Sequence, residues 1–330
     1  MNKQLTCNLC PKLCKISPGE TGDCRIRYNH NGKLLALTYG RPAAVHIDPV
    51  EKKPLFHVLP GSKAFSIATT GCNLHCLNCQ NAGLSQVSPL QRKAYKISPE
   101  KVVTTALKKS CQGIALTYTD PVVFYEYALD IGQKAKSRGL LNYWITAGYI
   151  NRQPLLKAIP SIDAVNLDLK AFSDKFYRDI CSATLKPVLE TAKLFKQRGI
   201  WLELTFLIIP GKNDSEEKIN QLTRWITKEL GPEVPLHISR FFPHHKLRNL
   251  PATPVSTLLK ARTIAKSNGI QFVYLGNLRG QGYQNTICPQ CQTILIERYG
   301  YKVQSNRIAK GRCPGCNHKI PGIWAETDGS

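Results

Sequence analysis

At residues 69–81 the chain reads Thr69-Thr70-Gly71-Cys72-Asn73-Leu74-His75-Cys76-Leu77-Asn78-Cys79-Gln80-Asn81, with cysteines spaced C-x3-C-x2-C. An apolar run at 64–68 precedes this stretch and is typical of a buried strand. Three thiolates on one loop can hold three irons of a cubane cluster and leave the fourth iron open. Ferredoxin motifs supply four cysteines, and zinc sites usually present two cysteine pairs. The spacing therefore predicts a cluster that can bind a molecule other than protein.

Strand-like and helix-like segments alternate after this loop. Alternation of this kind indicates parallel strands joined by helical crossovers. We therefore expect an α/β fold, a partial (β/α)6 barrel of TIM-like type, with small cysteine-rich modules at both ends. The expected strands are 64–68, 113–118, 142–146, 164–169, 201–209, 235–240 and 271–275, and the expected helices are 99–110, 121–138, 186–198, 215–230 and 254–267.

Polar clusters follow the expected strands, at the end of the barrel where such enzymes build their sites. They lie at 72–79, 117–120, 147–149, 168–170, 210–214 and 239–245. Asp168 and Lys170 alternate along one strand and should point to the same side, toward the interior. Such charges are costly there unless they are paired or bind a ligand. A ligand site and a structural ion pair are both consistent with this pattern.

Two further cysteine groups flank the expected barrel. Cys288, Cys291, Cys313 and Cys316 form a C-x2-C…C-x2-C pattern around short strands expected at 293–296 and 301–303. This pattern predicts a zinc ribbon, with a rubredoxin-like iron as the alternative, because a module this small needs a metal to fold. Cys7, Cys10, Cys14 and Cys24 are spaced less regularly and could bind zinc, which we favour, or an auxiliary iron–sulfur cluster. The remaining Cys111 and Cys181 are expected to be buried packing residues.

These groups suggest three domains. They are a cysteine-rich N-terminal module with its lead-in at 1–60, the barrel at 61–280, and a zinc-ribbon-like module at 281–330.

The chain has 330 residues, of which 42% are hydrophobic, and a formal net charge of +23. No stretch is long and apolar enough to span a membrane, and the start lacks the apolar core of a signal peptide. We therefore expect a cytoplasmic protein in which none of the thirteen cysteines forms a disulfide and most of them bind metals. The charge favours acidic partners such as nucleic acid or a flavodoxin-type electron donor, although a basic solvated surface also explains it.

The cysteine run resembles the cluster motif of the radical S-adenosylmethionine (SAM) enzymes. Nearly the whole chain is similar to the activating enzymes of glycyl radical enzymes, and within them to the AmmeMemoRadiSam-system radical SAM proteins. The resemblance is carried by the cluster run and by segments at 40–49, 51–57, 166–172, 207–214 and 237–243. It implies a radical SAM oxidoreductase that reductively cleaves SAM at a 4Fe–4S cluster and abstracts hydrogen from a protein or an undefined substrate.

The resemblance also implies site residues. Cys72, Cys76 and Cys79 would hold the catalytic cluster, and Tyr118, Thr119, Asp120, Asp168, Lys170, His237 and Arg240 would bind SAM. Asp120 stands where glutamate is usual, and Ala147 stands where asparagine is usual.

The implied partners are a flavodoxin- or ferredoxin-type donor and Memo-like or AMMECR-like proteins or a protein substrate. The alternative function is a nucleic-acid-binding or RNA-modifying protein that uses the cysteine-rich modules and the basic surface.

Overall fold

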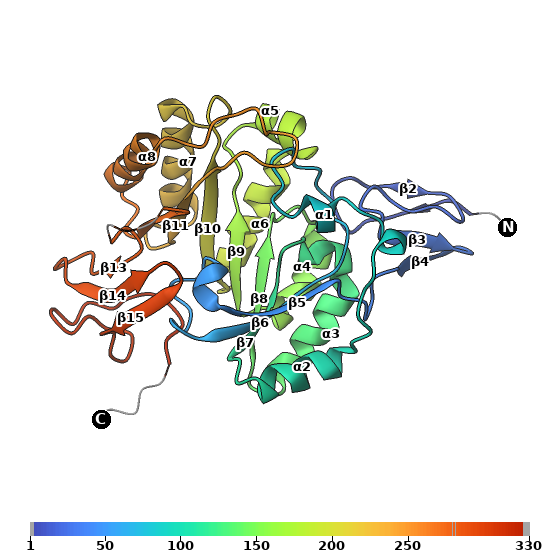
Figure 1. The fold of residues 1–330 in the computed structure, drawn as a ribbon, viewed down its shortest axis with the longest axis horizontal. Coiled ribbons are helices and arrows are strands. Elements are labelled where there is room, and N and C mark those ends of the chain that lie inside the picture. The colour runs from blue at the N-terminus through green and yellow to red at the C-terminus, as the bar shows by residue number, and fades with distance from the viewer. Residues whose placement is uncertain (1–2, 279, 281, 326–330) are drawn as a thin grey trace.

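The computed structural model describes residues 3–278, 280 and 282–325. Its centre is an eight-stranded sheet (Figure 1) in the order β12-β11-β10-β9-β8-β7-β6-β5. Strands β6 to β12 pair in parallel, and β5 pairs antiparallel to β6. The strands are β5 (Ala44–Pro49), β6 (Lys63–Ala68), β7 (Gly113–Leu116), β8 (Leu141–Thr146), β9 (Ala164–Asp168), β10 (Trp201–Ile208), β11 (Leu236–Arg240) and β12 (Val273–Gly276). Because β5 and β12 are separate edges, the sheet is an incomplete barrel, and the predicted fold class is confirmed.

Helices connect the parallel strands on the outer side of the sheet. Local signals set several helix starts: Ser98 and Ser215 each accept a hydrogen bond from a backbone N–H of the first turn. The predicted helix at 121–138 is divided into η3, a 3-10 turn, and α3. The connecting helices are α2 (Pro99–Lys108), η3 (Pro121–Phe124), α3 (Tyr125–Lys136), α4 (Arg152–Ala158), α6 (Leu185–Gln197), α7 (Glu216–Glu229) and α8 (Val255–Ser267).

Shorter turns complete the connections. They are η1 (Val50–Lys52), α1 (Ala82–Ser85), η2 (Pro89–Gln91), η4 (Ile159–Ser161), α5 (Asp174–Phe176) and the π-helix η5 (Tyr177–Cys181). None of these was expected from the sequence. Among the described residues, no helix is long and apolar enough to cross a membrane.

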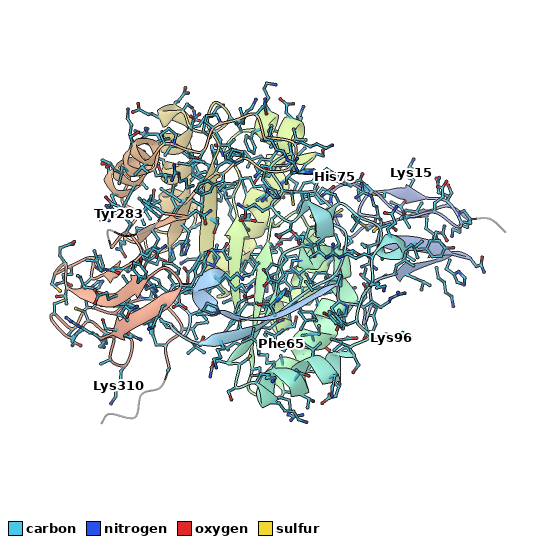
Figure 2. All side chains as sticks on the ribbon, in the orientation of Figure 1. Lys15, Phe65, His75, Lys96, Tyr283 and Lys310 are labelled. Carbon is cyan, nitrogen blue, oxygen red and sulfur yellow. The ribbon has the colours of Figure 1, made fainter. Side chains whose placement is uncertain are left out.

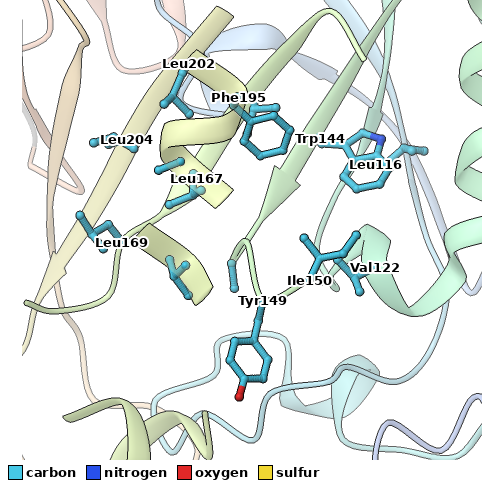
Figure 3. Packing of buried hydrophobic residues seen from close by; sticks show 14 of the residues in the cluster. Leu116, Val122, Trp144, Tyr149, Ile150, Leu167, Leu169, Phe195, Leu202 and Leu204 are labelled. Atoms are coloured by element: carbon cyan, nitrogen blue, oxygen red, sulfur yellow. The ribbon is translucent and has the colours of Figure 1, made fainter. Parts of the chain in front are cut away.

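The main core lies between the strands and the helices that cover them. Figure 3 shows Phe195 of α6 close to Leu167 and Leu202, and all three side chains are buried. Successive residues of a strand point to opposite faces, so these apolar positions fill the outer face. Residues of the other parity, such as Asn166 and Glu203, point into the barrel. Each strand can therefore carry polar groups inside the barrel without weakening the helix contacts.

The N-terminal segment lies at one side of the sheet, in blue in Figure 1, and forms two small hairpins. One pairs β1 (Leu5–Thr6) with β2 (Lys15–Ile16), and the other pairs β3 (Arg27–His30) with β4 (Lys33–Ala36). Arg27 connects the second hairpin to α3, because both terminal nitrogens of its guanidinium donate to the Glu126 carboxylate at 2.7 and 2.8 Å.

The C-terminal segment lies on the opposite side of the sheet, in red in Figure 1, and forms a three-stranded antiparallel sheet. Its strands are β13 (Thr286–Ile287), β14 (Ile294–Tyr299) and β15 (Lys302–Asn306). Leu295 and Ile296 share a buried cluster with Phe56, Phe272 and Tyr274. The segment therefore packs against the edge strand β12 and the 56–58 region, where the barrel is open.

Candidate active site

A cavity of about 440 Å³ opens at the carboxyl ends of the parallel strands. Its wall contains all three cysteines of the 69–81 loop. It also contains five of the residues expected to bind SAM, which are Tyr118, Thr119, Asp120, Asp168 and Lys170. The structure thus brings together groups from the ends of β6, β7 and β9 that are far apart in the sequence. Arg240 and His237 are not part of this wall.

The cysteine loop is held in place by hydrogen bonds from several directions. The Asn73 side chain donates to the Tyr149 carbonyl at 2.8 Å, and the Asn81 side chain donates to the Tyr118 carbonyl at 2.8 Å. The Leu74 N–H lies 3.5 Å from the Cys72 sulfur, and the Ser85 hydroxyl lies 3.1 Å from the Cys79 sulfur. Such contacts support thiolates, as metal ligands require.

The spacing of these sulfurs fits a cluster better than a single ion. In the part of the chain that the structure describes, no three of Cys72, Cys76 and Cys79 and their acidic or histidine neighbours have ligand atoms within 4.8 Å of one another. A cubane places each thiolate on a different iron, so wider spacing is expected. The fully buried thiol of Cys181 contacts that of Cys76 but is not in the cavity wall. The three cysteines therefore fit a site with one iron left open.

Asp120 is buried at the cavity wall, and other groups of the protein donate most of the hydrogen bonds that its carboxylate can accept. Its carboxylate accepts from the Val122 N–H at 3.0 Å, the Thr146 hydroxyl at 3.0 and 3.1 Å, and the Ala147 N–H at 2.7 Å. Burial nevertheless raises its pKa. The two positions that depart from the activating-enzyme pattern, Asp120 and Ala147, are thus in direct contact. The shorter carboxylate binds backbone where a longer one could reach into the cavity.

Lys170 and Asp168 form an ion pair at the cavity, with Nζ 3.2 Å from Oδ2. Burial opposes the charge of Lys170, but the Asp168 carboxylate and neighbouring thiols outweigh it, so the pKa of Lys170 is raised well above its usual value. Lys170 remains cationic and has further N–H groups free for an anion. The ion pair, one of the two arrangements that the sequence left open, is present at the cavity.

Lys53 is a second buried cation at the cavity, and it was missed in the sequence. Its Nζ donates to Asp48 at 2.7 Å and lies 4.3 Å from the centre of the Tyr118 ring. Tyr118, which has the unusual φ of +61°, donates its hydroxyl to the same carboxylate. Burial lowers the pKa of Lys53 to about 8. No local pattern marks Lys53, because its position depends on the pairing of β5 with β6.

His237 points into the barrel but lies below the cavity. Its Nε2 is 2.7 Å from Glu203 Oε2, and its ring stacks on Tyr274 at 5.1 Å between centroids. Arg240 donates from Nε to the Thr253 carbonyl at 2.7 Å and lies over the Phe242 ring. The structure therefore does not support the expected contact of either residue with SAM. On β11 it is Ser239 that reaches the cavity.

The C-terminal cysteines form a compact four-sulfur group. Cys288 and Cys316 are 3.6 Å apart, Cys291 and Cys313 are 3.5 Å apart, and all four sulfurs lie within 4.8 Å of one another. Zn–S bonds of about 2.3 Å in a tetrahedron require sulfurs about 3.8 Å apart. The geometry therefore fits one tetrahedral metal ion. Tyr301 of the same module reaches the wall of the large cavity.

The fold and the site together define an enzyme class: a partial α/β barrel whose first parallel strand leads into a three-cysteine cluster loop. Residues 66–223 match the sequence profile of the Radical SAM superfamily. An uncharacterized protein of Methanocaldococcus jannaschii is 44% identical over 97% of this chain and 96% of its own length. Pyruvate formate-lyase 1-activating enzyme of Escherichia coli K12 is 22% identical over 54% of this chain and 72% of its own length.

A radical SAM methyltransferase from Sphaerobacter thermophilus has the same fold. It aligns with a TM-score of 0.51 and 13% identity, over 67% of this chain and 68% of that chain. The chain belongs to the radical SAM superfamily and is related to the activating enzymes. It is a radical SAM enzyme, a family that uses SAM and a 4Fe–4S cluster.

Proposed function

We propose that this enzyme reductively cleaves SAM at a 4Fe–4S cluster held by Cys72, Cys76 and Cys79. Bound together, cluster and SAM would supply a 5′-deoxyadenosyl radical that abstracts a hydrogen atom from substrate. The observation that carries this proposal is the convergence of the three cysteines, Asp168 and Lys170 on one cavity of about 440 Å³.

The protein's own groups have definable tasks in this cavity. The Lys170 ammonium, kept charged by Asp168, offers donors to the carboxylate of SAM. Asp120 acts mainly through the backbone, because it holds the 146–147 turn in place. Asp48 and Lys53 hold Tyr118 at the cavity wall, where its ring would help to exclude water. These roles separate residues that bind the cofactor from residues that position the wall.

For the substrate, we propose a protein from which hydrogen is taken, as in a glycyl radical activation. Similarity to two activating enzymes supports this choice, at 22% identity for the pyruvate formate-lyase enzyme and 27% for the isethionate sulfite-lyase enzyme of Oleidesulfovibrio alaskensis. Memo-like and AMMECR-like proteins are the partners we propose to test first. A flavodoxin- or ferredoxin-type protein would supply the electron in the cytoplasm, and zinc would occupy the C-terminal four-cysteine group.

The reaction class can be tested with the full chain. The protein is reconstituted anaerobically with iron and sulfide, reduced with dithionite and incubated with SAM. We expect 5′-deoxyadenosine to accumulate. A reducible cluster that gives no 5′-deoxyadenosine would contradict the proposed reaction. Transfer of deuterium from a deuterated candidate protein into 5′-deoxyadenosine would then identify that protein as the substrate.

A further inference from the structure

The N-terminal cysteines Cys7, Cys10, Cys14 and Cys24 surround a pocket of their own. All four line one small cavity, together with Asn73 of the radical SAM loop. The Cys7 N–H donates to the Cys14 carbonyl at 2.9 Å, which brings the two ends of the first hairpin together. A Cβ on Gly22 would lie 3.5 Å from the Cys14 sulfur, so the chain passes close to this ligand. The four thiols therefore converge although their spacing in the sequence is irregular.

The sulfur spacing in this pocket differs from that of the C-terminal group. Among the described residues, only the C-terminal cysteines include three or more candidate ligand atoms within 4.8 Å of one another. Four thiolates on one zinc ion must be about 3.8 Å apart. Four thiolates on a cubane bind four separate irons and stand farther apart. Within the described part of the chain, neither the N-terminal cysteines nor Cys72, Cys76 and Cys79 bring three ligand atoms within 4.8 Å of one another, as a single zinc ion would require.

Two basic side chains, each paired with a carboxylate, lie beside the pocket. Lys12 and Arg27 both line the cavity, and Arg27 is buried. A cubane core of charge 2+ with four thiolates carries a net charge of about −2. Lys12 already pairs with Asp23 at 2.6 Å and Arg27 with Glu126 at 2.7 Å, so the two cations would offset only part of this charge. Apart from Asn73 and the cysteines, the rest of the wall is apolar and is formed mainly by Leu9, Val122 and Val123.

The pocket is in direct contact with the radical SAM loop. A Cβ on Gly71 would lie 2.7 Å from the Cys24 carbonyl oxygen, so the residue before Cys72 packs closely against Cys24. His75, which Figure 2 labels beside the N-terminal segment, has its Nε2 2.8 Å from Asp23 Oδ2. Asp23 and Cys24 are neighbours in sequence, as are His75 and Cys76. Short hydrogen-bonded and packed paths thus join the two sets of cysteines.

We propose that Cys7, Cys10, Cys14 and Cys24 bind a second 4Fe–4S cluster, with every iron held by protein, and that this cluster exchanges electrons with the one on Cys72, Cys76 and Cys79. One electron from a reduced flavodoxin- or ferredoxin-type donor reduces the second cluster from 2+ to 1+. The second cluster then returns to 2+ as the catalytic cluster is reduced from 2+ to 1+, and no proton or leaving group is involved. The metal assignment is independent of the proposed function, whereas the direction of electron flow rests on it.

The metal assignment is tested in a variant that leaves the N-terminal pocket intact. Cys72, Cys76 and Cys79 are all replaced by alanine, and the full chain is reconstituted with iron and sulfide in the presence of zinc. We expect about eight irons per wild-type chain and about four in the variant, with one zinc in each. The variant should also give a reduced-cluster EPR signal that SAM does not change. Two zinc ions per chain and no cluster iron in the variant would overturn the proposal.

A matched pair of variants completes the test. Cys7→Ala with Cys14→Ala should lose about four irons and keep a signal that SAM changes. Cys111→Ala removes a cysteine outside all three groups and should retain the wild-type iron content. If the N-terminal variant does not fold, the triple variant still decides the metal. SAM cleavage can fail in the wild type while about eight irons remain, so failure of the proposed function is distinguishable.

Contact between the clusters has its own readout. Two reduced clusters that are close together interact magnetically. The wild-type EPR signal should therefore be broader and relax faster than the sum of two separate signals, one from the triple alanine variant and one from the Cys7→Ala, Cys14→Ala variant. A wild-type spectrum equal to that sum would contradict electron exchange along this path, and would leave the metal assignment standing.

Discussion

The two terminal cysteine groups differ in both geometry and surroundings. The C-terminal sulfurs lie 3.5 and 3.6 Å apart in pairs, in a module that packs against the edge of the barrel. The N-terminal sulfurs are more widely spread and lie against the loop that carries Cys72 and Cys76. The first arrangement suits one ion that stabilises a fold. The second suits a redox centre beside an active site.

The way each group is attached reflects the same difference. Behind the C-terminal group lies a buried polar network in which Arg298 donates to the Phe56 carbonyl at 2.7 Å. In that network Glu203 accepts from the Phe56 and His57 N–H groups at 3.0 and 2.8 Å. The N-terminal group is attached to the cluster loop itself, through Asp23 and His75. Four cysteines in sequence therefore do not distinguish the two groups, whereas their spacing and neighbours in the structure do.

The largest expected effect comes from Cys76→Ala. This change removes one of three ligands of the catalytic cluster, so SAM cleavage should fall far beyond the roughly 10–100-fold loss typical of outer contacts. Zinc content should not change, because the C-terminal sulfurs are a separate group. The checks are 5′-deoxyadenosine formation and metal analysis, with Cys111→Ala as the control. Loss of zinc together with iron would show that the cysteine groups are wrongly assigned.

Cys313→Ala should act on stability rather than on the cluster. Structural zinc contributes on the order of 10 kcal/mol to the folding of small modules, so the C-terminal module should lose its metal and unfold locally. Limited proteolysis near residues 286–306 and zinc analysis would detect this. Iron content and the cluster EPR signals should remain. If iron is lost and zinc kept, the comparison between the two groups is reversed.

Glu203→Ala probes the network that joins the C-terminal module to the barrel. The change leaves donors of Phe56, His57 and Trp201 without an acceptor, so we expect a loss of about 3–5 kcal/mol in the free energy of unfolding. Denaturant titration measures it. Glu190→Ala on the exposed face of α6 is the control and should cost less than about 1 kcal/mol. Equal losses in the two variants would argue against the network.

The smallest effect is a pH dependence from His57. Burial lowers its pKa from the usual 6.5 to about 4. Between pH 6.5 and about 4, His57 is protonated in the unfolded chain but stays neutral in the folded chain. The free energy of unfolding therefore falls as the pH drops through this range. The contribution is about 3 kcal/mol. Denaturant titrations across this range should show the slope, and His57→Gln should flatten it; an unchanged slope would assign it to other groups.

The barrel was predictable because its strands are continuous apolar runs separated by strong helix signals. Ser98-Pro99 and Ser215 begin helices as expected, and the glycine-terminated helices end as expected. By contrast β5 was missed, since an edge strand with exposed His46 and Ile47 lacks the buried pattern. The helix α4 was missed because it is short and contains Pro154.

The candidate site was predictable where residues follow strands and was not where packing decides. Asp168 is the last residue of β9 and reaches the cavity by strand alternation, whereas Lys170 lies two residues beyond the end of the strand and also reaches the cavity. The side chains of His237 and Ser239 point to the same face of β11, but only that of Ser239 reaches the cavity. No local sequence pattern shows which of the two positions lies at the cavity. Lys53 and Tyr301 reach the cavity through long-range packing of β5 and of the C-terminal module.

The most direct measurement of the central claim is the EPR spectrum of the reduced wild-type enzyme with and without SAM. An open iron on Cys72, Cys76 and Cys79 predicts that SAM shifts the part of the signal that the triple alanine variant lacks, and leaves the rest in place. A spectrum that SAM does not alter in any part would contradict the account, because the iron would then have no free position.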